Sequence, residues 1–144
     1  MEEKLSLAEQ QTLLHLAREA MECGVRGIKL SSLDEESLSA HLREQAASFV
    51  TLTERGQLRG CIGTIEPGKD TLAEEIIANA INAATRDPRF SPVSAEELSQ
   101  LRYSVDVLSA PEPATLVVDK PFVFFIRDKP TGAILFVGRV VDPR

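Results

Sequence analysis

The spacing of apolar residues predicts two main helices. Apolar side chains recur every three or four positions along residues 5–21 and again along residues 72–84, as they do on one face of an amphipathic helix. Ser6 and Glu9 have the spacing of a capping box at the start of the first helix. The pattern weakens along residues 27–45, which indicates an extended stretch followed by a short helix.

Residues that typically start or stop helices set the predicted boundaries. Gly24 is the expected end of the first helix, because glycine readily adopts the left-handed conformation found just past a helix end. Asp70 or Thr71 is the expected N-cap of the second helix. Ser94 and Glu97 repeat the capping-box spacing, which predicts a further short helix.

Three segments have the composition and alternation of strands, namely residues 47–53, 58–65 and 103–108. Residues 54–57 contain a glycine and join the first two segments as a compact turn. The helices fall between the strands without the regular order of βαβ units. We therefore predict an α/β fold of the α+β type, with a mainly antiparallel sheet packed by helices.

The segment 58–63, Leu-Arg-Gly-Cys-Ile-Gly, is unusual for a strand. Glycine weakens a strand, so Gly60 and Gly63 indicate that something approaches the backbone closely. Alternation places Arg59, Cys61 and Gly63 on one face, where the guanidinium can favour the thiolate form of the cysteine. The alternative is a small buried cysteine beside a surface arginine.

A second polar segment follows the helix predicted at residues 72–84. Its Asp87 and Arg89 lie far in sequence from Arg59 and Cys61, yet both segments have polar residues where a plain core would be apolar. We expect these four residues to converge, with Asp87 pairing with an arginine. The alternative is an Asp–Arg pair that only fixes the loop after the helix.

Three blocks, residues 49–52, 58–63 and 83–92, resemble the AMMECR family in their order and spacing. The predicted first helix and residues 103–113 are similar to the family as well, so the resemblance extends over about residues 1–115. It implies an α+β domain in which a smaller lobe, made by the first helix and the 27–45 region, closes a groove.

The resemblance implies little about activity, because the family has no settled biochemical function. Its relatives in bacteria and archaea are often encoded beside a Memo-like protein and a radical S-adenosylmethionine enzyme. The resemblance therefore implies pathway partners of the Memo-like and radical-SAM types. This chain has no iron–sulfur cysteine triad of its own.

The C-terminal segment is different. Residues 119–143 closely resemble the C-terminal hairpin of serpins, while the rest of a serpin is missing, so the resemblance does not imply protease inhibition. We expect a single AMMECR-like domain over residues 1–144, in which a serpin-like β-hairpin replaces the family's own ending over about residues 117–144. The similarity to the AMMECR family would therefore end near Leu116.

The apolar runs at residues 122–126 and 134–137 predict where this hairpin packs. Consecutive apolar positions require burial on both faces of a strand. We expect an antiparallel hairpin with its turn around residues 129–132, added to the sheet that contains residues 103–108. If it is exposed instead, it would form a homo-oligomer.

Composition and charge narrow the function classes. The 144 residues are 43% hydrophobic with a net charge of -6, which argues against a general nucleic-acid binder. Cys23, Cys61 and two histidines are scattered without metal-ligand spacing, so we expect no metal and no cofactor. The sequence shows no targeting or spanning segment, and we expect a cytoplasmic protein.

Two functions remain open. The first is a ligand- or partner-binding accessory protein, with a groove around residues 58–63 that holds a small anionic ligand or a peptide. The alternative is an enzyme of a modification pathway that uses Cys61 as its nucleophile, although no histidine is placed as a base. The available carboxylates are Glu54, Asp87 and Asp106. The expected ligand-binding residues are Arg59, Gly60, Gly63, Asp87 and Arg89.

Overall fold

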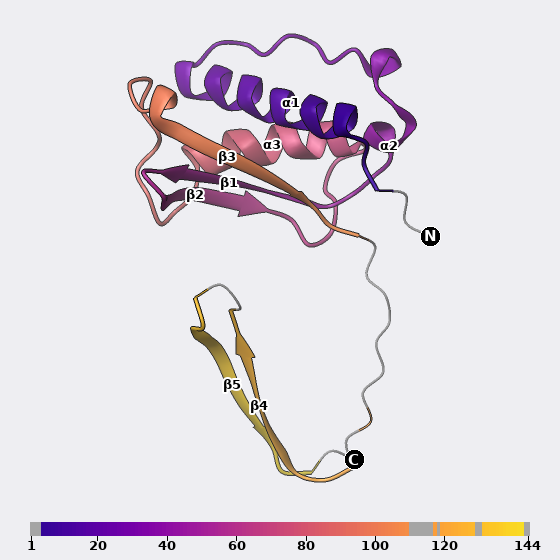
Figure 1. The fold of residues 1–144 in the computed structure, drawn as a ribbon, viewed down its shortest axis with the longest axis vertical. Helices are drawn as coiled ribbons and strands as arrows, with labels where there is room; N and C mark the ends of the chain where they lie inside the picture. Colours follow the sequence, from indigo (N-terminus) through magenta and orange to yellow (C-terminus); the bar gives the residue numbers. More distant parts are fainter. Residues whose placement is uncertain (1–3, 110–116, 118, 129–130, 143–144) are drawn as a thin grey trace. The chain divides into compact units, whose positions relative to one another are not determined.

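The computed structural model describes residues 4–109, 117, 119–128 and 131–142, which belong to two compact units, residues 1–110 and 111–144 (Figure 1). The sequence had predicted one domain over the whole length. Each unit has its own antiparallel sheet. The first unit contains α1 (Leu7–Arg26), the 3₁₀ turn η1 (Glu35–Ser37), α2 (Ala40–Arg43), β1 (Ser48–Glu54), β2 (Gln57–Gly63), α3 (Leu72–Thr85), the 3₁₀ turn η2 (Leu98–Gln100) and β3 (Leu101–Val107).

Helix α1 begins where the sequence predicted and ends later. The capping box is present: the Ser6 hydroxyl accepts from the Glu9 N–H, and the Glu9 carboxylate accepts from the Ser6 N–H. The predicted stop at Gly24 is wrong, because the helix continues to a left-handed Gly27 with φ 65°. Gly24 lies inside the helix, where an added Cβ would come within 3.1 Å of Ile81. This glycine lets α1 pack closely on α3.

Helix α3 begins at one of the two predicted caps. Thr71, and not Asp70, is the N-cap, and it forms a capping box with Glu74. The second predicted capping box is only half formed. Glu97 accepts from the Ser94 N–H at 2.7 Å, but the 3₁₀ turn η2 starts only after it. The other half is missing because the Glu97 N–H donates to the Ser94 carbonyl at 3.2 Å and not to the Ser94 hydroxyl.

The first sheet has the strand order β2-β1-β3, and both pairs are antiparallel. Arg55 (φ 50°) and Gly56 (φ 79°) form the two-residue connection between β1 and β2. Positive φ at both positions matches the turn that follows the natural twist of a hairpin. These features confirm the predicted α+β fold with a mainly antiparallel sheet.

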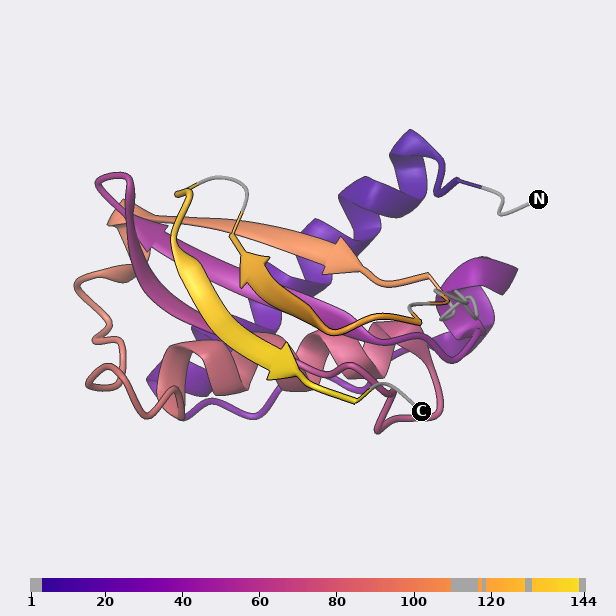
Figure 2. The same ribbon diagram turned by 90° about the horizontal axis from the view of Figure 1, so that it is seen from below.

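Helices α1 and α3 lie on the same face of this sheet (Figures 1 and 2). The buried face of β1 supplies Val50 and Leu52, and α3 supplies Leu72, Ile76 and four buried alanines. Helix α1 and the 27–45 region belong to the same core. Their buried residues are Leu13, Ala17, Ala20, Met21, Leu38 and Leu42.

The second unit is a hairpin of β4 (Phe122–Arg127) and β5 (Ile134–Val140). The predicted turn is confirmed where it is described: the Asp128 carboxylate accepts from the Thr131 N–H at 3.0 Å, and Gly132 has φ 73°. Residues 129 and 130 of the predicted turn lie outside the described residues.

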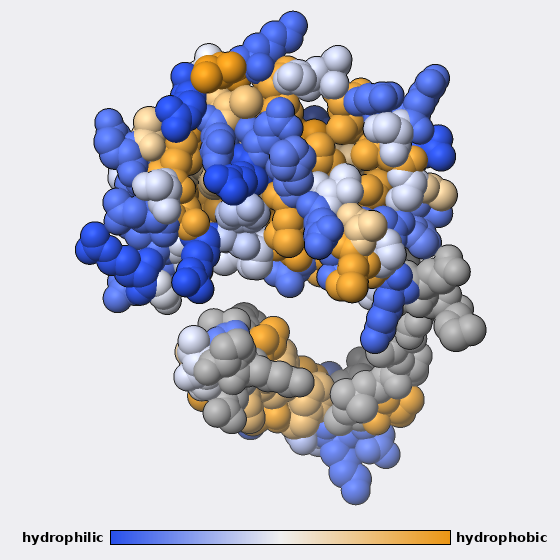
Figure 3. Space-filling model, turned by 45° about the horizontal axis from the view of Figure 1, so that its top comes forward, coloured by the Kyte–Doolittle hydropathy of each residue, from blue (hydrophilic) through white to orange (hydrophobic). Residues whose placement is uncertain are grey.

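The predicted addition of this hairpin to the sheet with residues 103–108 stays a prediction. β4 and β5 pair with each other in a separate two-stranded sheet, which satisfies half of their backbone groups without a third strand. Several of its large apolar side chains are exposed, among them Val123 at 66% and Phe125 at 61% (Figure 3). Self-association through these side chains stays a prediction.

Candidate functional site

The structure brings three of the predicted site residues together at the outer edge of β2. The N–H of Cys61 donates to Oδ2 of Asp87 at 2.9 Å. The carbonyl of Cys61 accepts from Nη2 of Arg89 at 3.3 Å. The loop after α3 therefore contacts both backbone groups of one residue in the strand, and the predicted convergence of Cys61, Asp87 and Arg89 is confirmed.

The register of the sheet explains why these backbone groups face outward. Thr64 N–H donates to the Ser48 carbonyl at 3.0 Å, so this pair is hydrogen-bonded across β1 and β2. Hydrogen-bonded and non-bonded pairs alternate along an antiparallel ladder, and the Thr51–Cys61 pair falls on a non-bonded position. Cys61 thus turns its N–H and C=O away from β1. Asp87 and Arg89 take the place that a neighbouring strand would have.

The Asp87–Arg89 pair is built around a buried carboxylate. Oδ1 of Asp87 accepts from the Arg89 N–H and from Nε, and Oδ2 accepts from Nη2 at 2.8 Å. The Asp87 side chain is 2% exposed and that of Arg89 55%. The hydrogen bonds from the Arg89 guanidinium, with that from the Cys61 N–H, hold the pKa of Asp87 well below its usual range, against the opposing effect of burial.

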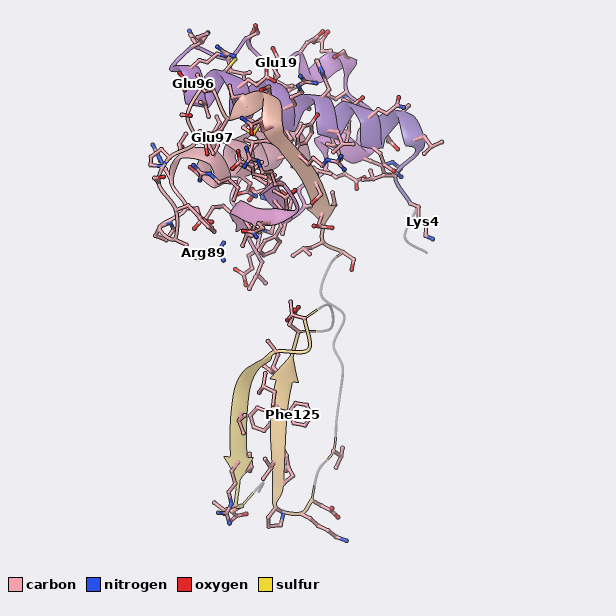
Figure 4. All side chains as sticks on the ribbon, turned by 60° about the vertical axis from the view of Figure 1, so that its left-hand side comes forward. Lys4, Glu19, Arg89, Glu96, Glu97 and Phe125 are labelled. Atoms are coloured by element: carbon pink, nitrogen blue, oxygen red, sulfur yellow. The ribbon has the colours of Figure 1, made fainter. Side chains whose placement is uncertain are left out.

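Arg59 does not join this cluster. Its guanidinium binds the Glu97 carboxylate at 2.8 and 3.2 Å, and it donates to the carbonyls of Ser91 and Pro92. The hydrogen bond from Arg59 lowers the pKa of Glu97 to about 2, helped by the Ser94 N–H. Arg59 therefore fixes the loop that leads into β3. Figure 4 labels Glu97 and Arg89 on this same connection.

The two glycines of the motif are required by contacts within the chain. An added Cβ at Gly60 would lie 2.2 Å from the carbonyl oxygen of Ala83, so the backbone of α3 rests directly on this strand. Gly60 thus lies on the helix-covered face, away from Cys61. An added Cβ at Gly63 would lie 2.3 Å from the ring of Phe49, its cross-strand neighbour. The predicted close approach is real, and it comes from a helix and a phenylalanine.

The opposite face of the sheet carries Cys61. Its Sγ lies 3.2 Å from Oγ1 of Thr51, the residue directly across on β1. Ser104 continues this row on β3. Thr51 and Cys61 are half-buried and Ser104 is exposed, so the row forms a polar strip on the face of the sheet opposite to α1 and α3.

Sequence reasoning missed a second cluster, at the start of α1. Oε1 of Glu9 accepts from the Ser39 hydroxyl at 2.6 Å and lies 2.9 Å from Nδ1 of His41. The Ser39 hydroxyl, followed by the capping hydrogen bonds with Ser6 and the contact with His41, lowers the pKa of Glu9 to about 2. The capping-box spacing identified Glu9, but nothing in the sequence indicated that it would also reach residues thirty positions away.

The described residues contain no group of three or more His, Cys, Asp or Glu side chains arranged to hold a metal ion. Within the same residues, no helix is long and apolar enough to cross a membrane.

Comparison with known proteins agrees with this architecture. The fold and site define an α+β domain whose antiparallel sheet has helices on one face and an Asp–Arg loop on its β2 edge. A model of the AMMECR1 family matches residues 14–135. The chain belongs to the AMMECR1 family.

Relatives and a solved structure support this assignment. The chain is 46% identical over 134 residues to a protein of Methanothermobacter thermautotrophicus, covering 93% of this chain and 69% of that one. It is 51% identical over 90 residues to a protein of Thermotoga maritima, covering 62% and 52%. The crystal structure of an uncharacterised protein from Pyrococcus horikoshii superposes with a TM-score of 0.66 at 29% identity, covering 91% and 68%. The chain thus spans between about half and about two-thirds of the length of these proteins.

The comparisons do not support the serpin-like C-terminal hairpin. The family match continues to residue 135, into β5 and beyond the point near Leu116 where we expected the family pattern to end.

Proposed function

We propose that this chain is a binding protein of accessory function, and that its binding surface is the Cys61 face of the sheet with Arg89 at its border. One observation carries the proposal: the Arg89 guanidinium is fixed on two atoms by a buried carboxylate, yet its side chain is 55% exposed. A surface arginine normally loses rotamer freedom when it binds a ligand. Here most of that freedom is already lost in the folded protein.

The chemistry of the surface favours an anionic group. The Arg89 guanidinium lies over the Phe90 ring at 5.5 Å, and Nη1 makes no hydrogen bond within the described residues, so its two N–H groups can donate to a carboxylate or a phosphate. The Thr51 hydroxyl and the Cys61 thiol lie on the adjoining face and supply further polar contacts. We therefore infer a small anionic ligand, or the carboxylate or phosphate of a partner peptide.

A thermal-shift titration tests this proposal. Inorganic phosphate, compared with chloride at equal ionic strength, should raise the Tm of the wild-type protein, because a ligand that binds only the folded state stabilises it. Arg89→Gln should abolish the phosphate-dependent shift. Arg86→Gln is the matched control, since Arg86 is an exposed arginine three positions away on the same loop, and it should keep the shift. Equal shifts in both variants would overturn the proposal.

The Cys61-dependent enzyme receives less support. Asp87 is the carboxylate nearest to Cys61 in the site, and its oxygens are occupied by the Cys61 N–H and three N–H groups of Arg89. Its lowered pKa also makes it a weak base. Alkylation with iodoacetamide followed by mass spectrometry distinguishes a nucleophilic Cys61 from a cysteine of a binding surface. Modification of Cys61 at least tenfold faster than of Cys23 would favour a nucleophile, whereas comparable rates fit a binding surface.

A further inference from the structure

The Glu9 carboxylate joins two segments of the first unit that are far apart in sequence. It lies in the first turn of α1, where Oε2 accepts from the Ser6 N–H at 2.7 Å. Its other oxygen, Oε1, is in contact with both the Ser39 hydroxyl and Nδ1 of His41. One carboxylate therefore caps α1 and also fastens the 39–43 segment, which contains α2, to the start of that helix.

The contact between Glu9 and His41 is partly shielded from water. The side chain of Glu9 is 13% exposed and that of His41 is 31% exposed. With its pKa lowered to about 2 by its hydrogen bonds to Ser39, Ser6 and His41, Glu9 is ionised throughout the pH range in which histidine changes its charge. An ionised carboxylate only accepts hydrogen bonds, so Nδ1 of His41 donates to it.

We propose that Glu9 and His41 form a pH-sensitive clamp, which holds the 39–43 segment on α1 more tightly when His41 is protonated. A neutral imidazole gives Glu9 one hydrogen bond, whereas an imidazolium adds the attraction of opposite charges. Within the described residues, the hydrogen bonds between α1 and the 39–43 segment all end on Glu9. The clamp involves neither Cys61 nor Arg89, so it goes beyond the function proposed above and does not depend on it.

The charges around His41 favour its protonated form. In the described part of the chain, the charged side chains beside it, in its own helix or around the cavity that it lines are three carboxylates and two cations, namely Glu9, Glu44, Asp106, Lys4 and Arg43. All except Glu9 are exposed, so water and salt weaken their effect. The shielded carboxylate of Glu9 lies at hydrogen-bond distance, and an opposite charge this close favours the charged form of His41.

The direction of the pH effect follows from this arrangement. His41 should keep its proton to a higher pH in the folded protein than in the unfolded chain, where histidine titrates near about pH 6.5. The clamp is then at full strength below about pH 6.5, and it weakens as the pH rises through the value at which the folded protein releases this proton.

A titration of the histidine ring signals by NMR, with the full 144-residue chain, tests the clamp. The chain has two histidines, so His41→Gln and His15→Gln assign the two sets of signals. Glu9→Gln removes the charge and retains the capping box, because glutamine serves at this position as well as glutamate does. It should lower the pH midpoint of His41 by about one unit or more and leave the midpoint of His15 unchanged.

A second measurement tests whether the titration fastens the segment. In the wild-type protein, the amides of residues 40–43, after correction for their intrinsic rates, should exchange several-fold more slowly at about pH 5.5 than at about pH 8. Glu9→Gln should abolish this difference. His15→Gln is the matched control and should keep it, since the His15 side chain is 76% exposed and lies 3.8 Å from Glu19 of the same helix.

Three results would overturn the proposal. The His41 midpoint could be the same in the wild-type protein and a folded Glu9→Gln variant. Exchange at residues 40–43 could be independent of pH in the wild-type protein, which would show that His41 titrates without fastening the segment. His41→Gln and His15→Gln could also change the pH dependence of the Tm equally, and this comparison decides alone if Glu9→Gln fails to fold.

Discussion

On the outer edge of β2, a carboxylate and a guanidinium occupy both backbone groups of Cys61, whereas on the outer edge of β3 the N–H and C=O groups of Tyr103, Val105 and Val107 face a groove. An exposed strand edge can pair with another chain, and proteins usually block it. This domain blocks one edge with the loop between α3 and β3. At the outer edge of β3, no loop of the first unit takes the corresponding place among the described residues.

The largest effect on stability should follow from disturbing the contact between α3 and β2, the strand whose outer edge is blocked. Gly60→Ala should lower the free energy of unfolding by about 3 kcal/mol, because the new Cβ would overlap the Ala83 carbonyl oxygen and push α3 away from β2. Ser104→Ala, on the exposed face of β3, should change it by less than about 0.5 kcal/mol. Urea denaturation of both variants measures this, and similar values would contradict the close contact between α3 and β2.

A smaller effect should follow from removing the carboxylate that blocks the edge. Asp87→Ala should cost about 2 kcal/mol, since it leaves the Cys61 N–H without its partner and Arg89 without its counterion. Asp106→Ala is the control at an exposed carboxylate of β3 and should cost less than about 0.5 kcal/mol. If Asp87→Ala also showed a concentration-dependent increase in mass by sedimentation, the blocking role of the loop would be shown directly.

The smallest effect concerns the Arg59–Glu97 pair and depends on pH. The pKa of Glu97 falls from 4.5 to about 2 on folding, so the pair stabilises the folded state above about pH 4.5 and loses this effect as the pH falls toward 2. Glu97→Gln should therefore cost about 1 kcal/mol at pH 6, and the difference from the wild-type protein should disappear near pH 2. A difference that stays constant from pH 6 to pH 3 would contradict the role of the ionised carboxylate.

The sequence was informative where local rules decide the structure. The capping box at Ser6, the candidate N-cap at Thr71, the glycine turn of the β1–β2 hairpin and the alternation in β3 all predicted elements that the structure contains. The motif at residues 58–63 was also correctly identified as unusual, because two glycines inside a strand require a close contact.

The partners in those contacts could not be predicted. Gly24 was the predicted helix stop, but it lies inside α1, where an added Cβ would come within 3.1 Å of Ile81 of α3. Arg59 alternates onto the face of Cys61, yet Glu97 holds it, thirty-eight positions away. The groove beside β3 is lined by residues of α1, α3, the 41–46 region and β3, and no local pattern in the sequence predicts it.

Hydrogen exchange at two amides tests the central claim most directly. In the full chain, the Cys61 amide should exchange about as slowly as the Val50 amide inside the sheet, because Asp87 accepts its hydrogen. The Val105 amide should exchange at least about a hundredfold faster than the Cys61 amide, although both residues lie in edge strands of the same sheet. Equal protection of the two amides would show that the β3 edge is paired in solution, and it would contradict an open edge.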